Sequence, residues 1–295
     1  NIDDCLHIVI SMNLANLIDD QCLIKPLLLY AKDVFLSDCI AAVRYLSLLQ
    51  EDELKIDAIA KLVVETENGE KIFTPLSNEL PPISQVSITP DLQHKAIERS
   101  AEIAEYRGLH LKAAKIYKLI ERYDHVIDLA CIELRKFIGG FLDDSVRVEI
   151  NNLYDEIYVN NYPVSYEKLN AMRILVRFAR AFYYIHKDKK NPEYRNAVDE
   201  IEMAEFLPTS KEKARSFRET LMANEHLRKA LPELIIMTIH CYAELYTRNS
   251  KSNIKKPGMW RKDREKAEAI LELTSDIDIP NYAQKQLLDF SLKFQ

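Results

Sequence analysis

Glycine is scarce in this chain: five of the 295 residues are glycine, well below the ~7% of an average protein. Sheet-based enzymes use glycine in tight turns and phosphate-binding loops, whereas in a helix it costs about 1 kcal/mol per interior site relative to alanine. No phosphate loop, dinucleotide-binding motif, serine-hydrolase elbow or zinc-protease motif occurs in the sequence. The composition therefore favours helices and disfavours a sheet-based enzyme.

Paired cysteines and long apolar runs are missing as well. The cysteines are Cys5, Cys22, Cys39, Cys131 and Cys241. Because they are odd in number and form no C-x-x-C pair, they argue against a zinc site or a disulfide framework and favour reduced, buried thiols in a cytosolic or nuclear protein. No apolar run approaches the ~18 residues of a membrane helix, and no signal-peptide pattern is present. The chain starts at Asn1 inside an apolar helical pattern, which indicates a piece of a longer protein.

Apolar residues recur at helical spacing along almost the whole chain. Residues 4–65 predict about four helices, and helices resume at residue 91. The later helices are predicted near 91–107, 109–122, 124–139, 143–159, 164–187, 192–206, 211–230, 232–249, 261–275 and 281–293. Between the two groups, residues 66–90 hold four prolines and the Asn68-Gly69 pair, which forbid a continuous helix and predict a functional or crossover loop.

Capping residues indicate where several of these helices begin. Ser37 or Asp38 is suited to cap one helix, and Thr89 precedes a proline that fits the first turn of another. Asp143 is a cap candidate in the same way. Pro232 is predicted to begin a new helix, because the missing N–H of proline is tolerated in a first turn.

The helices at 164–187 and 232–249 are apolar on most sides and are expected in the inner layer of a helical stack. The polar residues of the first helix form one narrow stripe, which we interpret as a solvated face. They are Asn170, Arg173, Arg177, Arg180 and Lys187.

The stretch AEYRGLHLKAAKIYKLIERYDHVIDL, residues 104–129, predicts two packed helices joined at Gly108. Ala113 and Ala114 permit a close backbone approach, and weaker echoes of the pattern follow at unequal spacing. Three tyrosines are interpreted as packing residues: Tyr106, Tyr117 and Tyr123. We therefore predict an all-α fold, an irregular and elongated α-helical solenoid of stacked antiparallel helices, with residues 1–295 forming a single solenoid. Its parts are a first helical group at 1–65, the crossover loop at 66–90 and stacked helix pairs at 91–295.

Residue clusters that would support catalysis or bind a metal are not found. Three Asp-Asp pairs occur, but none has the third carboxylate of a magnesium-binding D-D-x-x-D helix, which disfavours a metal-dependent all-α enzyme. His240 and Cys241 are adjacent and would point about 100° apart on a helix, so a packed core histidine is favoured over a metal ligand. His125 and Asp128 are interpreted as a local stabilising pair. We predict no catalytic, cofactor-binding or metal-binding residues.

The sharpest local charge feature is RNSKSNIKKPGMWRKDREK, residues 248–266, in a chain whose net charge is −6. Basic residues outnumber acidic ones here, and the segment holds the chain's one tryptophan. The first interpretation is a solvated loop whose tryptophan anchors the next helix. A contact with a protein partner, or with phosphate in nucleic acid or lipid headgroups, stays open as an alternative. The candidate contact residues are Lys255, Lys256, Trp260 and Arg261.

Four stretches spread over most of the chain together carry a family resemblance. They are HIVISMNLANLIDD, LSDCIAAVRYLSLL, the pair at 104–129, and AVDEIEMAEFLPTSKEKARSFRETLMANEHLRKALPELIIMTIHCYAELY. In these stretches the chain resembles the nucleoporin-interacting-component family, the linker nucleoporins of the inner ring of the nuclear pore. The resemblance rests on spaced apolar and small residues and not on an invariant motif.

This resemblance implies the C-terminal part of the family's helical scaffold domain, a bent stack related to coat-protein scaffolds. It implies a structural role in pore assembly and nucleocytoplasmic transport at the nuclear envelope, without catalysis, cofactor or small-molecule substrate. The implied partners are other inner-ring nucleoporins, including a smaller membrane-associated linker nucleoporin, and channel nucleoporins that bind through a segment absent from this chain. Direct contact with nucleic acid or membrane is not expected.

Three other functions compete with this one. The first is a tetratricopeptide-like adaptor of another large assembly, which would capture peptides in a concave groove. The second is a module that contacts lipid or nucleic acid through residues 248–266. The third is the metal-dependent all-α enzyme that the aspartate pattern disfavours.

Overall fold

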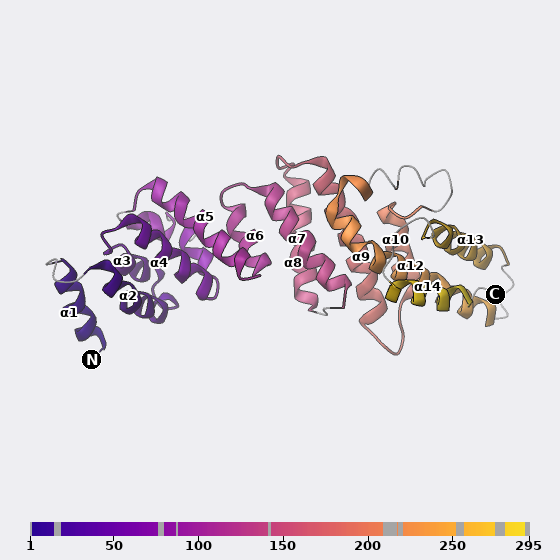
Figure 1. Cartoon of the computed structure of the whole chain (residues 1–295), viewed down its shortest axis with the longest axis horizontal. Helices are drawn as coiled ribbons and strands as arrows, with labels where there is room; N and C mark the ends of the chain where they lie inside the picture. The colour runs from indigo at the N-terminus through magenta and orange to yellow at the C-terminus, as the bar shows by residue number, and fades with distance from the viewer. Residues whose placement is uncertain are drawn as a thin grey trace. The chain divides into compact units, whose positions relative to one another are not determined.

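A computed structural model of the chain contains helices as its regular elements (Figure 1). It describes residues 2–14, 19–75, 80–86, 88–140, 143–208, 217, 221–251, 257–274 and 281–292. Within these ranges no strand occurs, which confirms the predicted all-α class. The chain forms two compact units, Asn1–Leu129 and Ala130–Gln295.

The first unit begins with the four helices predicted for residues 4–65. They are α1 (Ile2–Leu14), α2 (Asp20–Phe35), α3 (Cys39–Leu46) and α4 (Asp52–Glu65). The unit continues through the 3₁₀ helices η1 (Gly69–Phe73) and η2 (Pro82–Gln85), then α5 (Pro90–Tyr106), α6 (His110–Lys118) and the first part of α7 (Tyr123–Ile138). Asp38 and Thr89 cap α3 and α5 as predicted, since their side chains accept hydrogen bonds from the N–H groups of Ala41 and Leu92.

Helices α4 and α5 run in the same direction. Arg99 and Arg107 of the α5 segment form ion pairs with Asp57 and Glu65 of α4, so a step of eight residues on one helix matches a step of eight on the other. This pair therefore departs from the antiparallel pattern, because two parallel helices need a connection that returns along their length. The connecting segment contains η1 and η2 and contributes buried side chains such as Ile72.

A buried carboxylate ties the first helices together. Asp20, at the start of α2, is 4% exposed and accepts hydrogen bonds from the backbone N–H groups of Gln50 and Glu51 at 2.6 and 2.7 Å. The side-chain amide of Asn13 in α1 donates to the other oxygen at 3.1 Å. Glu51 precedes α4 and makes no side-chain cap of its own. Asp20 thus holds the backbone that leads into α4, although it lies about 30 residues earlier in the sequence.

The joint between α5 and α6 is a Schellman motif. Gly108 has a φ of +74°, its N–H donates to the carbonyl of Glu105 at 2.8 Å, and the N–H of Leu109 donates to the carbonyl of Ala104 at 2.9 Å. Tyr117 and Tyr123 are buried, as predicted. Tyr106 is 94% exposed, so its interpretation as a packing residue is wrong. It occupies the last turn of α5, on the side of the helix that no described neighbour covers.

The second unit is built around two long helices. Its elements are the rest of α7, α8 (Asp144–Val159), α9 (Tyr166–His186), α10 (Tyr194–Ala204), α12 (Glu225–Lys251), α13 (Pro257–Thr274) and α14 (Asn281–Leu292). Helix α9 packs on α8, α10 and α12, while α12 packs on α9, α10, α13 and α14. Both are therefore inner-layer helices, as their apolar faces predicted. A further helix was expected at 211–230. Residues 225–230 belong to α12, and most of residues 211–224 lie outside the described residues.

The prediction that Pro232 begins a helix is wrong, because α12 runs through it without a break. An interior proline removes one backbone hydrogen bond and crowds the preceding turn at a cost of about 3 kcal/mol. Packing compensates for this loss: Leu231, Leu234 and Ile235 around the proline are at most 3% exposed. Pro26 occupies an interior position of α2 in the same way.

The cysteines follow the prediction in part. Cys131 and Cys241 are buried, whereas Cys39 is half-buried and Cys22 is exposed on α2. Burial raises the pKa of the Cys241 thiol well above its usual value. The two buried thiols are therefore core residues, and the other two lie at or near the surface.

Candidate functional site

None of the four residues predicted to contact a partner has a described side chain. Lys255 and Lys256 lie outside the described residues. Trp260 and Arg261 belong to α13, and their side chains are likewise not described. The segment 248–266 is also less of a loop than expected, since α12 extends to Lys251 and α13 begins at Pro257.

The adjacent His240 and Cys241 do not form a reactive pair. The Nε2 atom of His240 lies 3.3 Å from the hydroxyl oxygen of Tyr194, and the two rings meet edge to face. Cys241 is fully buried beside it. The interpretation of His240 as a packed histidine is thereby confirmed. In the described part of the chain, no three His, Cys, Asp or Glu side chains gather in a way that could hold a metal ion.

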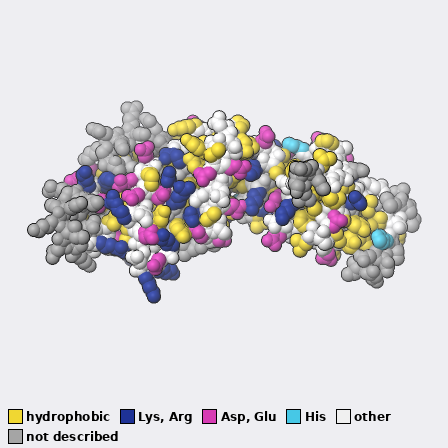
Figure 2. Space-filling view, turned by 180° about the vertical axis from the view of Figure 1, so that it is seen from behind, with side chains coloured by type: hydrophobic (Ala, Val, Ile, Leu, Met, Phe, Trp, Pro, Cys, Tyr) yellow, Lys and Arg dark blue, Asp and Glu magenta, His cyan; other side chains and the backbone are white. Residues whose placement is uncertain are grey.

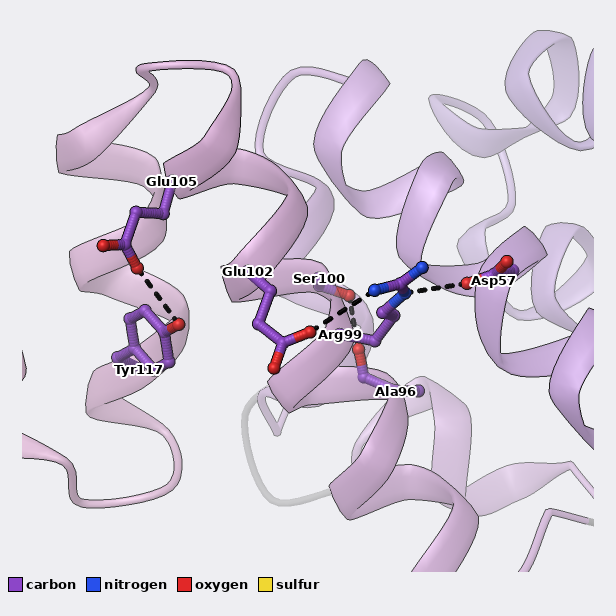
Figure 3. Close-up of polar contacts among 7 residues, drawn as sticks. All are labelled: Asp57, Ala96, Arg99, Ser100, Glu102, Glu105 and Tyr117. Atoms are coloured by element: carbon purple, nitrogen blue, oxygen red, sulfur yellow. Dashed lines mark hydrogen bonds and ion pairs between the residues drawn. The ribbon is translucent and has the colours of Figure 1, made fainter.

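A polar layer joins α4 and α5 in the first unit (Figure 3). The Nε of Arg99 donates to Asp57 across the two helices at 2.8 Å, and its Nη1 lies 3.5 Å from Glu102 on its own helix. The buried hydroxyl of Ser100 donates to the carbonyl of Ala96 at 2.5 Å. The Arg99–Asp57 contact fixes the register of α5 on α4, and the other two contacts lie within α5.

Glu105 of α5 contacts side chains of α6 and α7, and its contact with Tyr117 of α6 is drawn in Figure 3. The Tyr117 hydroxyl donates to its Oε2 at 3.2 Å, and Nε2 of His125 lies 2.8 Å from the same oxygen. Burial, with the nearby charge of Glu105, raises the pKa of Tyr117 to about 12, so its hydroxyl stays protonated at neutral pH. His125, interpreted as half of a local pair, thus also links α7 to α5.

The C-terminus of α4 is held by cations from three other parts of the unit. Glu65 pairs with Lys32 of α2 and, at 2.9 Å, with Arg107 after α5. Lys112 of α6 donates to the carbonyls of Val64 and Thr66 at 2.9 and 2.6 Å. Cations at a helix C-terminus offset its negative end, so this cluster stabilises the stack and presents no reaction centre.

The middle of the polar stripe of α9, at Arg173 and Arg177, is covered by α10, which corrects its interpretation as a solvated face, whereas Lys187 at its end is exposed. Arg177 pairs with Glu200 of α10 at 2.8 Å, and Arg173 donates to the carbonyls of Met203 and Ala204 at 3.4 and 3.1 Å. The later residue of α9, Arg177, therefore contacts the earlier residue of α10, and Arg173 contacts the later ones, so the two helices are antiparallel. Helix α10 packs over this part of the stripe, and hydrophobic periodicity alone does not indicate which helix packs there.

A hollow of about 410 Å³ opens where α9, α10, α12 and α13 meet. On its wall, the Tyr242 hydroxyl and the Lys266 ammonium group both contact Oε1 of Glu202, at 3.1 and 2.7 Å. Apolar side chains such as Ile174 and Ile270 complete the lining. This mixture of fixed polar groups and apolar wall suits docking of another molecule more than catalysis.

Sequence reasoning missed this hollow. Its lining comes from four helices, and their pairing follows from tertiary packing that residue spacing does not encode. Its polar groups, such as Glu202 and Lys266, are 64 residues apart in the sequence. No local signal could have brought them together.

The surface of the described part is mixed in character. On the face shown in Figure 2, acidic and basic side chains are interspersed, with hydrophobic side chains among them. Several large apolar side chains are strongly exposed: Leu36, Tyr106, Val159 and Tyr166. None of the described helices is both long and apolar enough to span a bilayer.

Comparison with known proteins identifies similar solved structures and a matching family. The fold is similar to the crystal structure of Chaetomium thermophilum Nic96 SOL, with a TM-score of 0.69 and 15% sequence identity. The match covers 91% of this chain and 46% of that chain, so this chain spans less than half of the length of its structural relative. No match was found among the curated proteins.

The family assignment rests on the sequence itself. The profile of the Nup93/Nic96 family matches residues 14–280, which is most of the chain. The helical fold agrees with that match. This chain belongs to the Nup93/Nic96 family.

Proposed function

We propose that this chain is part of a structural scaffold of the inner ring of the nuclear pore complex. The observation that carries the proposal is the family match over residues 14–280, supported by the solenoid fold shared with Nic96 SOL. In this role the chain supports pore assembly and nucleocytoplasmic transport by docking to other nucleoporins. No enzymatic activity is proposed.

The fold gives a physical reason for such a role. Stacked helices bury their core between neighbours and expose long edges, so they offer much docking surface per residue. The exposed aromatic and aliphatic side chains Tyr106, Tyr166, Leu36 and Val159 are of the kinds that protein interfaces bury. The proposed partners are inner-ring nucleoporins, among them a membrane-associated linker nucleoporin. Channel nucleoporins would bind through a segment outside this chain.

The proposal is tested by proximity labelling in cells. The full-length protein that contains this chain is fused to a biotin ligase, and a nuclear protein that does not enter pores carries the same ligase as the control. We expect the fusion to concentrate at the nuclear rim and to label inner-ring nucleoporins above the control. Labelling of nucleoporins at the level of the control would refute the assignment.

A further inference from the structure

A groove of about 480 Å³ lies along α8, between it and the facing sides of α9 and α10. We call it the α8 groove and define it by Arg147, Asn151 and Asp155 of α8, Arg180 and Tyr183 of α9, and Glu200 of α10. We infer that the α8 groove binds an extended segment of a partner protein whose acidic side chain pairs with Arg180. This inference rests on the proposed docking function and deepens it by assigning a site and a partner chemistry.

The first observation is an amide oxygen that lacks a donor. Asn151 is 9% exposed, and its Oδ1 accepts no hydrogen bond from any described residue. Buried polar atoms in native proteins are nearly always paired, so an unpaired acceptor on the wall of a groove indicates a ligand that brings a donor. The side-chain amide of asparagine carries an acceptor and donors in one plane, which matches the N–H and C=O of a peptide backbone.

The second observation is the charge balance of the groove. Arg147 is paired with Asp144 and Glu200 with Arg177, so these charges are already compensated. Arg180 is half-buried and makes no hydrogen bond or ion pair with another described residue. A guanidinium group that is partly removed from water gains more from a carboxylate partner than an exposed group does, because solvent screens the exposed charge.

Asp155, the remaining charge in the groove, is exposed and remains well hydrated without a partner. The partner chemistry is therefore decided by Arg180. The carboxylates of Asp155 and Glu200 in the lining also disfavour a densely anionic surface such as a membrane. A single acidic side chain on a peptide satisfies Arg180 without bringing further negative charge against these two residues.

The third observation is that the walls are already held in place. The guanidinium group of Arg147 lies over the ring of Tyr183, 4.3 Å from its centroid, and the ammonium group of Lys187 lies 4.9 Å from the centroid of the Tyr184 ring. Val148, 43% exposed on the groove wall, offers an apolar contact to the side chains of an extended segment. A preformed groove loses little conformational entropy on binding, which favours a short peptide.

The test uses a displayed library of random peptides of about 12 residues, selected against the purified chain and then synthesised. We expect the enriched peptides to contain Asp or Glu and to protect residues 144–159 and 177–187 from hydrogen exchange. The Arg180→Glu variant should weaken binding by at least about tenfold. Exchanging the acidic residue of the peptide for arginine should restore binding to that variant.

Two controls keep the result interpretable. Arg228→Glu reverses an exposed arginine on α12, outside the groove, and should leave the affinity unchanged. Asn151→Leu keeps the approximate shape of the side chain and should weaken peptide binding, while its melting temperature shows whether the fold is intact. The inference is overturned if no peptide is enriched, if the enriched peptides lack acidic residues, or if they bind Arg180→Glu as tightly as the wild-type chain.

The peptide test and the test of the proposed function fail separately. If the full-length protein is absent from the nuclear rim while Arg180 still governs peptide binding, the pore assignment fails and the α8 groove remains a binding site. If the protein reaches the rim and labels nucleoporins but Arg180→Glu changes no peptide affinity, the groove assignment fails alone.

Discussion

Backbone conformation at Gly108 limits which residues the joint between α5 and α6 accepts. Its φ of +74° lies in the left-handed region, and a Cβ placed there would meet no atom within 4 Å. The cost of a substitution is therefore conformational, about 1–2 kcal/mol for an ordinary side chain and less for asparagine. We expect Gly108→Ala to lower the free energy of unfolding in urea by about 1 kcal/mol. Gly108→Asn should lose less, and an equal loss in both variants would contradict the explanation.

The buried carboxylate of Asp20 should be one of the most sensitive positions in the first unit. Asp20→Ala removes the acceptor for two partly buried backbone N–H groups and for the buried side-chain amide of Asn13. We expect the free energy of unfolding to fall by about 3 kcal/mol in denaturant titrations. Asp19→Ala next to it removes an exposed helix cap that accepts from Cys22 and should cost clearly less. Similar losses in both variants would argue against the role assigned to Asp20.

Residues that act locally were predictable from the sequence, and those that act at a distance were not. Asp38, Thr89 and Asp143 were predicted as caps because a cap and its N–H partner lie within three residues of each other. The partners of Asp20 lie 30 and 31 residues away, so no local pattern marked it. The prediction that Tyr106 is a packing residue was wrong for a related reason, because residue type does not indicate which side of a helix is covered by a neighbour.

At the scale of the helix, Pro232 offers a direct test of how α12 is stabilised. Replacing an interior proline restores the missing backbone hydrogen bond and removes the crowding of the preceding turn. We expect Pro232→Ala to raise the free energy of unfolding by about 2 kcal/mol, measured by denaturant titration. Pro90→Ala is the matched control, because Pro90 is the first residue of α5, where its N–H would be unpaired in any case. A gain of the same size at Pro90 would contradict this account.

The ion pairs that connect α2, α4 and the end of α5 should make the first unit sensitive to acid. Burial alone would raise the pKa of Glu65, but the hydrogen bonds and charges of Lys32 and Arg107 outweigh it and hold the pKa below its usual value. The stabilisation is therefore present above the unfolded pKa of about 4.3 and is lost as the pH falls through the folded pKa.

We expect Glu65→Gln to lower the free energy of unfolding by about 1 kcal/mol at pH 7. The difference from the wild type should shrink as the pH falls below about 4, because Glu65 becomes protonated first in the unfolded chain and then, at lower pH, in the folded chain. Glu67→Gln changes an exposed glutamate two residues away and should have no effect at either pH. A difference that stays constant down to pH 3 would rule out the ion pairs as its cause.

The arrangement of helices was predicted less well than their existence. Hydrophobic periodicity and caps placed α5 to α10 to within a few residues, because both signals are contained in each helix. The parallel course of α4 and α5 and the covered arginine stripe of α9 depend on which helices pack together. The α8 groove was not predicted for the same reason, although Arg147, Asn151 and Asp155 follow one another at intervals of four residues on one face of α8.

For the molecule as a whole, fold class and family were predictable because many weak signals add up over 295 residues. Low glycine content, helical spacing and the four resembling stretches pointed to the same assignment, which the profile match over residues 14–280 confirms. Partner surfaces were not predictable, since each is assembled from side chains of several helices. The structural match covers 91% of this chain and 46% of the Nic96 SOL chain.

The two units contain carboxyl groups with opposite responses to pH. In the second unit Asp263 is 4% exposed, and burial raises its pKa, with the charge of Glu202 adding to the effect. A group with a raised folded pKa stabilises the protein below its unfolded pKa and loses that contribution as the pH rises. Acid therefore weakens the contribution of Glu65 in the first unit and restores that of Asp263 in the second.

We expect Asp263→Asn to raise the free energy of unfolding by about 1 kcal/mol at pH 7, because the variant buries no charge. The gain should vanish near pH 3, where the wild-type carboxyl is protonated in both the folded and the unfolded chain. Asp289→Asn on α14 alters an exposed aspartate and should change neither value. An Asp263→Asn variant that is less stable than the wild type at pH 7 would contradict the assignment.

The position of Asp20 also has a consequence for the order of folding events. Its carboxylate can leave water without penalty only when Gln50 and Glu51 have arrived, and that requires closure of a loop of about 30 residues. We expect such a long-range contact to form after the local helices, late on the folding pathway. In stopped-flow experiments, Asp20→Ala should therefore accelerate unfolding much more than it slows folding. The hydrogen bonds of Asp20 with Gln50 and Glu51 would then slow the unfolding of the first unit.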